Sequence, residues 1–243
     1  MSSTQASGTD HVRGHSAPGE PSAPIVQNVG QFAPAVRFQM RTAGAIYWIT
    51  DHSLWITRLG PAPRVTPPVA NRGGRFPNAA PALPTRGVNL ELSFPSHSPM
   101  VSVVSSDPLP SRISYFLGSG RTRWHSGVPT FGLVTWRGLY PGLSLTLAST
   151  GSGPTLVVHA ARGARPPALK LRVAGATALR PSSAGVVART AVGDVPLPEV
   201  LQGNHPSRVS IAGNVVHFLA DGALGAQRAD PFSGRPSFGK GLV

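Results

Sequence analysis

The chain of 243 residues contains no cysteine, and this absence excludes disulfides, thiol catalysis and cysteine-ligated metal sites. Acidic side chains are also scarce, with nine Asp and Glu against 22 Lys and Arg, so the formal net charge is +13. Calcium sites need several carboxylate oxygens, and glycoside hydrolysis needs two carboxyl groups on one cleft. The few acids show no paired spacing, so we expect neither chemistry.

Other signatures of chemistry and of membrane insertion are absent too. No apolar run approaches the roughly 18 residues of a membrane-spanning helix, and the N-terminus lacks the apolar centre of a secretory signal. There is no Gly-x-Ser-x-Gly elbow and no His-Glu-x-x-His site. His11 and His15 have helical spacing but lie in a segment too polar to form a helix. We therefore expect no catalytic residue, no metal site, no cofactor and no transmembrane segment.

Arginine supplies nearly all of the positive charge, because lysine occurs only at Lys170 and Lys240. A basic balance can indicate binding to nucleic acid or to another anionic surface. The arginines are scattered along the chain and form no single basic run, which argues against a dedicated binding arm. The favoured interpretation is compositional, since a GC-rich genome enriches Arg, Ala, Gly and Pro together.

What the chain has in abundance is turn residues, with 28 glycines and 26 prolines, and short β-forming runs between them. The clearest run is Val88–Phe94, in which apolar and polar residues alternate strictly. We predict an all-β fold, an antiparallel β-sandwich-like domain with long Pro/Gly-rich loops. Further strands are expected in two runs around Asp51-His52 and at Met100–Ser105, Ile113–Leu117, Thr130–Trp136, Leu143–Thr150, Thr155–Ala160, Ala168–Val173, Val186–Thr190, Arg208–Ile211 and Val215–Leu219.

The domain boundaries follow from composition. Residues 1–24 are polar and rich in Gly, Pro and Ser, and we predict a disordered tail. We expect residues 25–225 to form a single β domain, interrupted at 60–86 by a Pro/Gly/Arg-rich loop whose prolines forbid a central strand. Residues 226–243 lose all periodicity and are expected to be an irregular C-terminal end.

Aromatic side chains are the best candidates for contact with a ligand. Trp124 follows a Gly/Arg-rich turn and is either an exposed stacking platform or, as we prefer, a plug packed over one edge of the sandwich. Arg121 and Arg123 flank that turn and could pair with an anion, and Trp55 is a second candidate platform. Tyr140 precedes a Pro-Gly turn, so we expect a buried ring whose hydroxyl bonds to backbone at the corner.

An ordered set of motifs is familiar: Asn28-x-Gly30-Gln31-Phe32, then Tyr115-Phe116-Leu117-Gly118, Trp124, Val128-Pro129 and Leu139-Tyr140-Pro141-Gly142-Leu143. It resembles the N-terminal β domain, of unknown function, of bacterial secreted proteins that carry SBBP (seven-bladed β-propeller) repeats. The resemblance covers roughly residues 25–225. It implies an extracellular or cell-surface location and transfers no catalytic residue. The implied structural framework is Asn28, Gly30, Gln31, Tyr115, Phe116, Gly118, Pro129, Tyr140, Pro141 and Gly142.

These observations predict a non-catalytic structural or interaction module of an exported bacterial protein. Its partner is not identified by the sequence; a polysaccharide or another surface protein would fit. One alternative is a carbohydrate-binding module, which requires Trp124 or Trp55 to be exposed beside polar groups. Another is arginine-mediated binding to nucleic acid or to an anionic surface, less favoured for nucleic acid, which requires arginines to converge on one face and binding to weaken with salt.

Overall fold

β-Strands make up about two thirds of the part of the chain that the computed structural model describes, and the only helix there is a short 3₁₀ helix at Arg121–Arg123. The all-β prediction is confirmed. No helix in this part is long and apolar enough to cross a membrane. Residues 1–22, most of the loop at 60–86 and the end at 226–243 lie outside the description, so the predictions for them stay predictions. The described residues are 23–60, 86–150, 153–161, 168–183, 185–202 and 205–219.

Fourteen of the strands form one large sheet, and three form a small second sheet. The small sheet contains β11 (Ala178–Ser182), β12 (Gly185–Thr190) and β13 (Gly193–Pro196). The large sheet contains β1 (Ile25–Gln27), β2 (Phe38–Arg41), β3 (Ile46–Ile49), β4 (Ser53–Leu59), β5 (Gly87–Ser93), β6 (Ser102–Phe116), β7 (Trp124–Tyr140), β8 (Leu143–Thr150), β9 (Gly153–Ala160), β10 (Leu169–Ala174), β14 (Glu199–Gln202), β15 (His205–Pro206), β16 (Arg208–Ala212) and β17 (Val215–Leu219).

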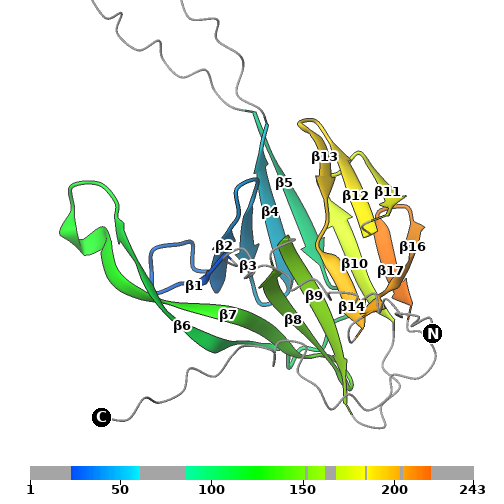
Figure 1. Cartoon of the computed structure of the whole chain (residues 1–243), viewed down its shortest axis with the longest axis horizontal. Coiled ribbons are helices and arrows are strands. Elements are labelled where there is room, and N and C mark those ends of the chain that lie inside the picture. Colours follow the sequence, from blue (N-terminus) through cyan, green and yellow to red (C-terminus); the bar gives the residue numbers. More distant parts are fainter. Residues whose placement is uncertain are drawn as a thin grey trace, which may run out of the picture.

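The long strand β7 joins the two halves of the large sheet. β6 pairs along most of its length, while β8 pairs with its C-terminal part and β1 with Thr130 and Phe131. A strand has only two edges, so β8 and β1 follow each other along the edge opposite β6. From β8 the sheet continues to β9, β14 and β15; from β1 it continues through β2, β3, β4, β5, β10 and β17 to β16. The halves curve around a shared core (Figure 1).

Alternate residues of both halves fill this core. In β5, Leu90 and Leu92 are buried while Asn89 is exposed, as the alternating pattern predicted. Trp136 is the largest fully buried side chain, packed edge-on to Phe94 with ring centroids 5.2 Å apart. The indole N–H of Trp136 donates to the backbone oxygen of Thr50 at 2.9 Å, so its one polar atom is paired.

The large sheet is nearly closed, and here the sandwich prediction is wrong in its topology. Only Ser207 separates β15 at one end of the sheet from β16 at the other, so the chain itself joins the two ends. The Ser207 N–H donates to Val200 O at 2.9 Å, and Gln202 Nε2 donates to Leu219 O at 2.9 Å across this seam. The result is one barrel-like sheet rather than two stacked sheets. One pair, β14 with β9, is parallel where only antiparallel pairs were expected.

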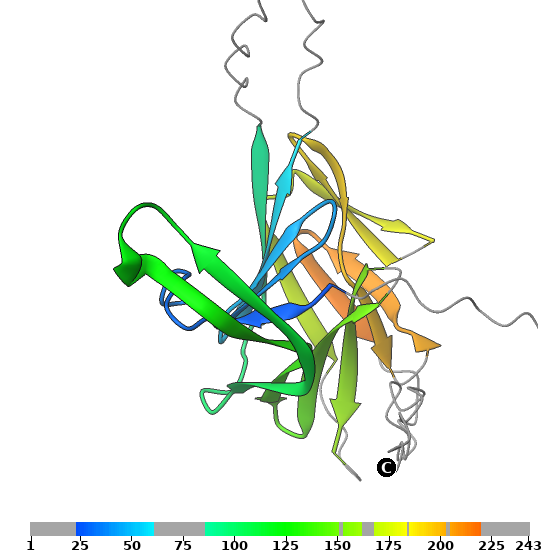
Figure 2. The ribbon, with the colours of Figure 1, turned by 60° about the vertical axis from the view of Figure 1, so that its left-hand side comes forward.

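β6 and β7 form a two-stranded arm that extends beyond the rest of the sheet (Figures 1 and 2). The sequence predicted separate strands at Met100–Ser105 and Ile113–Leu117, ended in between by Asp107-Pro108, and this prediction is wrong. The strand continues through Pro108 with a shift of register, and Asp107 adopts a φ of 57°. β6 is an edge strand, and an edge tolerates proline because the missing N–H would have faced solvent.

Candidate functional site

The loop between β1 and β2 is shaped by one amide side chain, that of Asn28. Its Nδ2 donates to Ala33 O at 3.1 Å and to Val36 O at 2.7 Å. Its Oδ1 accepts the N–H groups of Gly30 at 3.0 Å and of Phe32 at 3.1 Å. Asn28 therefore closes the loop from both sides and sets the direction in which Phe32 leaves it.

Two further residues of this motif have equally local roles. Gln31 Nε2 donates to Gln27 O at 2.7 Å, while Gln31 Oε1 accepts the N–H of Val29 at 2.7 Å. Gly30 has a φ of 113°, a left-handed conformation that side chains disfavour, and His125 lies where a Cβ would project. The framework that the resemblance implied at this point is thus a hydrogen-bonded loop.

Phe32 extends from this loop into a line of aromatic rings. Its ring lies edge-on to Trp48, with centroids 5.5 Å apart, and edge-on to Tyr115 of the arm, with centroids 5.4 Å apart. Trp48 is directly opposite Trp55 across β3 and β4, so the two indoles share the outer face of the sheet. We call Tyr115, Phe32, Trp48 and Trp55 the aromatic row. Trp55, at its far end, is 36% exposed.

Hydrogen bonds fix the orientation of both indoles. Trp48 Nε1 donates to Thr57 Oγ1 at 3.0 Å, and Thr57 Oγ1 donates to Asn89 Oδ1 at 2.8 Å. Trp55 Nε1 donates to Ser53 Oγ at 3.0 Å. Each N–H is therefore paired within the protein, and each ring is held in place before any ligand arrives.

Polar groups flank the row on neighbouring strands. Glu91 is opposite Trp55 and forms no salt bridge among the described residues. Gln39 is opposite Trp48, is only 4% exposed, and its Oε1 has no hydrogen-bond partner there. Leaving a buried acceptor unpaired costs about 1–3 kcal/mol, and because this oxygen is buried it is not open to a ligand on the sheet surface.

The hydroxyl of Tyr115 stays protonated at neutral pH. Burial raises its pKa above the ordinary value, and the positive charge of Arg41 opposes this only in part. The row thus contains a neutral phenol at one end, with Arg41 near it, and has the Glu91 carboxylate beside Trp55 at the other. Such a border offers both donors and acceptors to a polar, uncharged ligand.

The end of the arm carries the other aromatic candidate. Phe116 and Trp124 form the last pair of the β6–β7 ladder, with ring centroids 5.4 Å apart, and are 63% and 39% exposed. The Arg121 guanidinium lies 5.7 Å from the Trp124 ring centroid, and Trp124 Nε1 donates to Gly118 O at 3.1 Å. We call Phe116, Leu117, Arg121, Arg123 and Trp124 the arm tip.

The structure thus brings together three of the four predicted contact residues and separates the fourth. Trp124, Arg121 and Arg123 meet at the arm tip, whereas Trp55 belongs to the aromatic row. The preferred prediction that Trp124 plugs an edge of the sandwich is wrong, because Trp124 is the first residue of β7, is 39% exposed and lies outside the hydrophobic core. The arm that β6 and β7 form extends past the body of the sheet (Figure 2). The roles of Phe32 and Trp48 were missed, since nothing in their local sequence shows that rings from different strands meet.

The prediction for Tyr140 is confirmed for the buried ring and the backbone partner, but that partner lies in the β5–β6 connection and not at the Pro-Gly corner. The Tyr140 ring is buried, and its hydroxyl donates to Pro95 O at 2.9 Å. Burial raises the pKa of Tyr140 to about 12. Pro141 and Gly142 make the two-residue turn to β8, and Gly142 has the φ of 71° that the third position of a type II turn requires.

A cleft of about 470 Å³ brings an acid and a histidine together, the arrangement that an enzyme would need. Its lining includes Asp51, His52 and Arg37. Arg37 binds both carboxylate oxygens of Asp51, Nε to Oδ1 at 3.0 Å and Nη2 to Oδ2 at 2.9 Å, and these hydrogen bonds and the charge raise the pKa of Arg37. The imidazole rings of His52 and His97 stack with their centroids 4.4 Å apart. The Asp51 carboxylate is thus already paired with the Arg37 guanidinium.

No cluster of three or more metal-ligating side chains occurs in the described residues.

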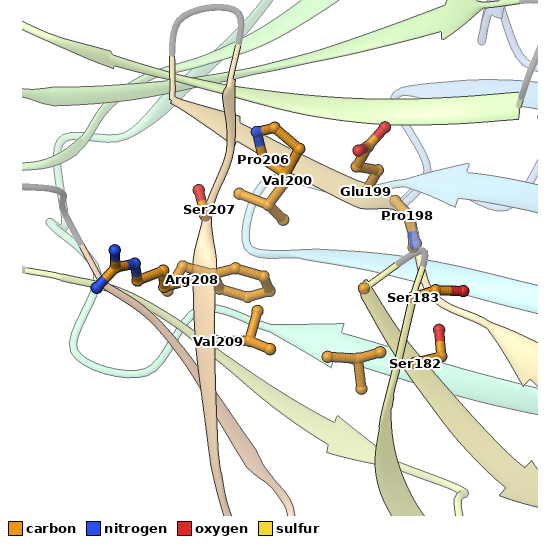
Figure 3. A pocket seen from close by; sticks show the side chains of 12 residues that line it. Ser182, Ser183, Pro198, Glu199, Val200, Pro206, Ser207, Arg208 and Val209 are labelled. Atoms are coloured by element: carbon orange, nitrogen blue, oxygen red, sulfur yellow. The ribbon is translucent and has the colours of Figure 1, made fainter.

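A smaller cavity of about 280 Å³ lies at the seam between the sheet ends (Figure 3). Val200 and Val209 line it together with Phe218, while Arg208 extends away from it. Ser207 also lines it, and its Oγ is buried without a hydrogen-bond partner in the described part of the chain. The lining is largely apolar, so this space reflects incomplete packing where the sheet fails to close.

Comparison with known proteins gives one match. A family model described as Domain of unknown function (DUF7948) matches residues 25–202. No curated protein and no solved structure matches the chain. The matched segment runs from β1 to β14 and so contains both the aromatic row and the arm.

Proposed function

The chain belongs to the DUF7948 family, domains of unknown function, and we propose that it is a non-catalytic interaction module that binds a polysaccharide along the aromatic row. The resemblance to the N-terminal domains of SBBP-repeat proteins supports an exported bacterial protein as its setting. The observation that carries the proposal is the pair of neighbouring indoles, Trp48 and Trp55, held by hydrogen bonds on an outer sheet face.

The geometry suits a sugar polymer because a pyranose ring exposes C–H groups on its faces and hydroxyls at its rim. The C–H groups pack against an aromatic ring, and directly opposite residues in a sheet have Cβ atoms only about 5 Å apart. Trp48 and Trp55 therefore offer two adjacent apolar contacts on neighbouring strands, so a bound polymer would run across the strands. An open sheet face accepts an extended polymer, whereas a closed pocket would require a chain end.

Polar groups beside the indoles supply the hydrogen bonds that orient the rim hydroxyls. The Asn89 amide and the Glu91 carboxylate lie on β5, next to the strand that carries Trp55. Because the indole N–H groups are already paired, the rings lose little freedom on binding. This preorganisation favours affinity.

Affinity electrophoresis tests the proposal, with soluble β-glucan, xylan or starch cast in the gel. We expect at least one polysaccharide to retard the protein, and Trp55→Ala to weaken binding about tenfold or more, since burying one large aromatic contributes about 1.5–3 kcal/mol. Trp55→Phe should retain part of the binding. Met100→Ser, which changes a highly exposed apolar residue in the β5–β6 connection, serves as the matched control.

Thermal unfolding must show the same midpoint for Trp55→Ala and the native chain, so that lost binding is not lost folding. Equal retardation of both proteins, or none in any of these polysaccharides, would rule out the aromatic row as the site. Binding that disappears instead in Trp124→Ala would transfer the site to the arm tip.

A further inference from the structure

The arm tip is an apolar surface in an unusual place, at the end of a two-stranded projection (Figures 1 and 2). Phe116, Leu117 and Trp124 are 63%, 50% and 39% exposed, and none belongs to the hydrophobic core. Single exposed apolar residues are ordinary on protein surfaces. Three together at the end of the arm expose apolar area outside the hydrophobic core.

Three N–H donors at the tip are already paired. Trp124 Nε1 donates to Gly118 O at 3.1 Å, and the Arg123 N–H donates to Gly120 O at 3.1 Å. The Trp124 N–H closes the 3₁₀ turn by donating to Arg121 O. A surface that enters an apolar medium must carry few unpaired donors, and these bonds satisfy the indole N–H and two backbone N–H groups beside the apolar side chains.

The charge around the tip has one sign. Arg121 and Arg123 are exposed there, and Arg112 lies behind them with Nη1 donating to Gly127 O at 3.1 Å. In the sequence no acidic residue occurs between Asp107 and Asp194. The scatter of arginines along the sequence argued against a dedicated binding arm. In the folded protein, however, these three arginines lie together on the β6–β7 arm. A binding partner that matches the tip therefore has an anionic surface layer above an apolar interior.

Among such surfaces, the dimensions favour a lipid bilayer. A stable protein–protein interface buries about 800 Å² on each partner, more than the three apolar side chains of this tip present. Bilayer binding instead sums shallow insertion of a few apolar groups with attraction of nearby cations to anionic lipids. Base stacking would compete with the Arg121 guanidinium, which lies over one face of the Trp124 ring.

We propose that the arm tip docks the protein on anionic lipid bilayers, with Phe116, Leu117 and Trp124 inserted among the headgroups and Arg112, Arg121 and Arg123 bound to lipid phosphates. The proposal depends on the arm and not on the aromatic row, so it stands or fails independently of polysaccharide binding. The protein would then bind its ligand while held at a membrane surface.

Co-sedimentation of the full chain with vesicles tests this, using phosphatidylcholine alone and phosphatidylcholine mixed with phosphatidylglycerol. We expect binding to the mixed vesicles that weakens as salt rises. The triple variant Phe116→Ser, Leu117→Ser, Trp124→Ser and the double variant Arg121→Gln, Arg123→Gln should each reduce binding about tenfold or more. Met100→Ser and Arg137→Gln, which change an exposed apolar residue and an exposed arginine away from the tip, should leave it unchanged.

A second measurement reports insertion rather than attraction. Brominated lipids in the mixed vesicles should quench part of the tryptophan fluorescence of the native chain, and Trp124→Phe should lose this quenching while still binding. Binding that survives in the triple variant would overturn the proposal. So would tip-dependent binding of single-stranded DNA in preference to vesicles, or tip-dependent dimerisation in size-exclusion chromatography.

Discussion

At the scale of single residues, the β1–β2 loop shows how one amide connects a sequence motif to the site. Asn28 offers a donor to Ala33 O and Val36 O and an acceptor to two backbone N–H groups. Aspartate would supply acceptors only, and would face the two carbonyl oxygens with negative charge. The residue type is therefore dictated by the loop, and the loop in turn places Phe32 between Trp48 and Tyr115.

Tyr140 should make stability depend on pH at the alkaline end. Its pKa is about 12 in the folded protein and about 10 in an unfolded chain. Above pH about 10 the unfolded state loses this proton and the folded state keeps it, so the free energy of unfolding falls as pH rises toward about 12. Below pH about 10 the contribution is fully present. Urea denaturation across this range measures it.

The variant Tyr140→Phe provides the comparison, because its unfolding cannot respond to this hydroxyl. Burial also raises the pKa of Tyr47, so only the difference between the two proteins belongs to Tyr140. We expect the variant to be less stable at neutral pH, since Pro95 O loses its donor, and to show a shallower alkaline decline. Parallel alkaline curves would contradict the assignment.

At the scale of elements, the two halves of β7 lie in different environments. Its C-terminal half lies in the core between β6 and β8, and its N-terminal half continues into the arm. We expect Trp136→Ala to destabilise the protein by about 3–5 kcal/mol, the range for large-to-small changes in a core. Trp124→Ala should change stability by less than about 1 kcal/mol, as for exposed sites.

Chemical denaturation of both variants under the same conditions measures the difference, and equal denaturant slopes would show that the unfolding reaction is unchanged. A loss of several kcal/mol in Trp124→Ala would mean that the arm tip supports the fold. The tip would then be a structural element, and the argument for docking would lose its premise.

At the scale of the whole molecule, closure of the large sheet depends on Ser207. Its N–H bonds to Val200 O, whereas its hydroxyl is buried and unpaired among the described residues. We expect Ser207→Ala to be neutral or slightly stabilising, because an unpaired buried hydroxyl is removed. Ser207→Pro removes the N–H and should destabilise by about 1–3 kcal/mol.

Thermal or urea unfolding of this pair tests whether the seam is held by its backbone. If Ser207→Ala proved as damaging as Ser207→Pro, the hydroxyl would have a partner that matters. If neither variant changed stability, the bond from Ser207 to Val200 would contribute nothing to closure.

Local patterns in the sequence determined which segments become strands and how the main turns are made. Alternation in Val88–Phe94 places Leu90 and Leu92 in the core, and the Pro-Gly turn after Tyr140 forms as predicted. These features were predictable because side-chain period and backbone conformation are decided by neighbours in the chain. The resemblance likewise pointed to Asn28, Gly30 and Gln31 before their hydrogen bonds were known.

Only the tertiary structure decided which aromatic side chains face solvent and how the sheet closes. Trp124 and Trp136 lie on one strand, yet the first is 39% exposed and the second 0%, because β8 and the core cover only the C-terminal half. The aromatic row joins residues from β3, β4, the β1–β2 loop and the arm. Burial and convergence depend on contacts between segments distant in the chain, and no local pattern contains that information.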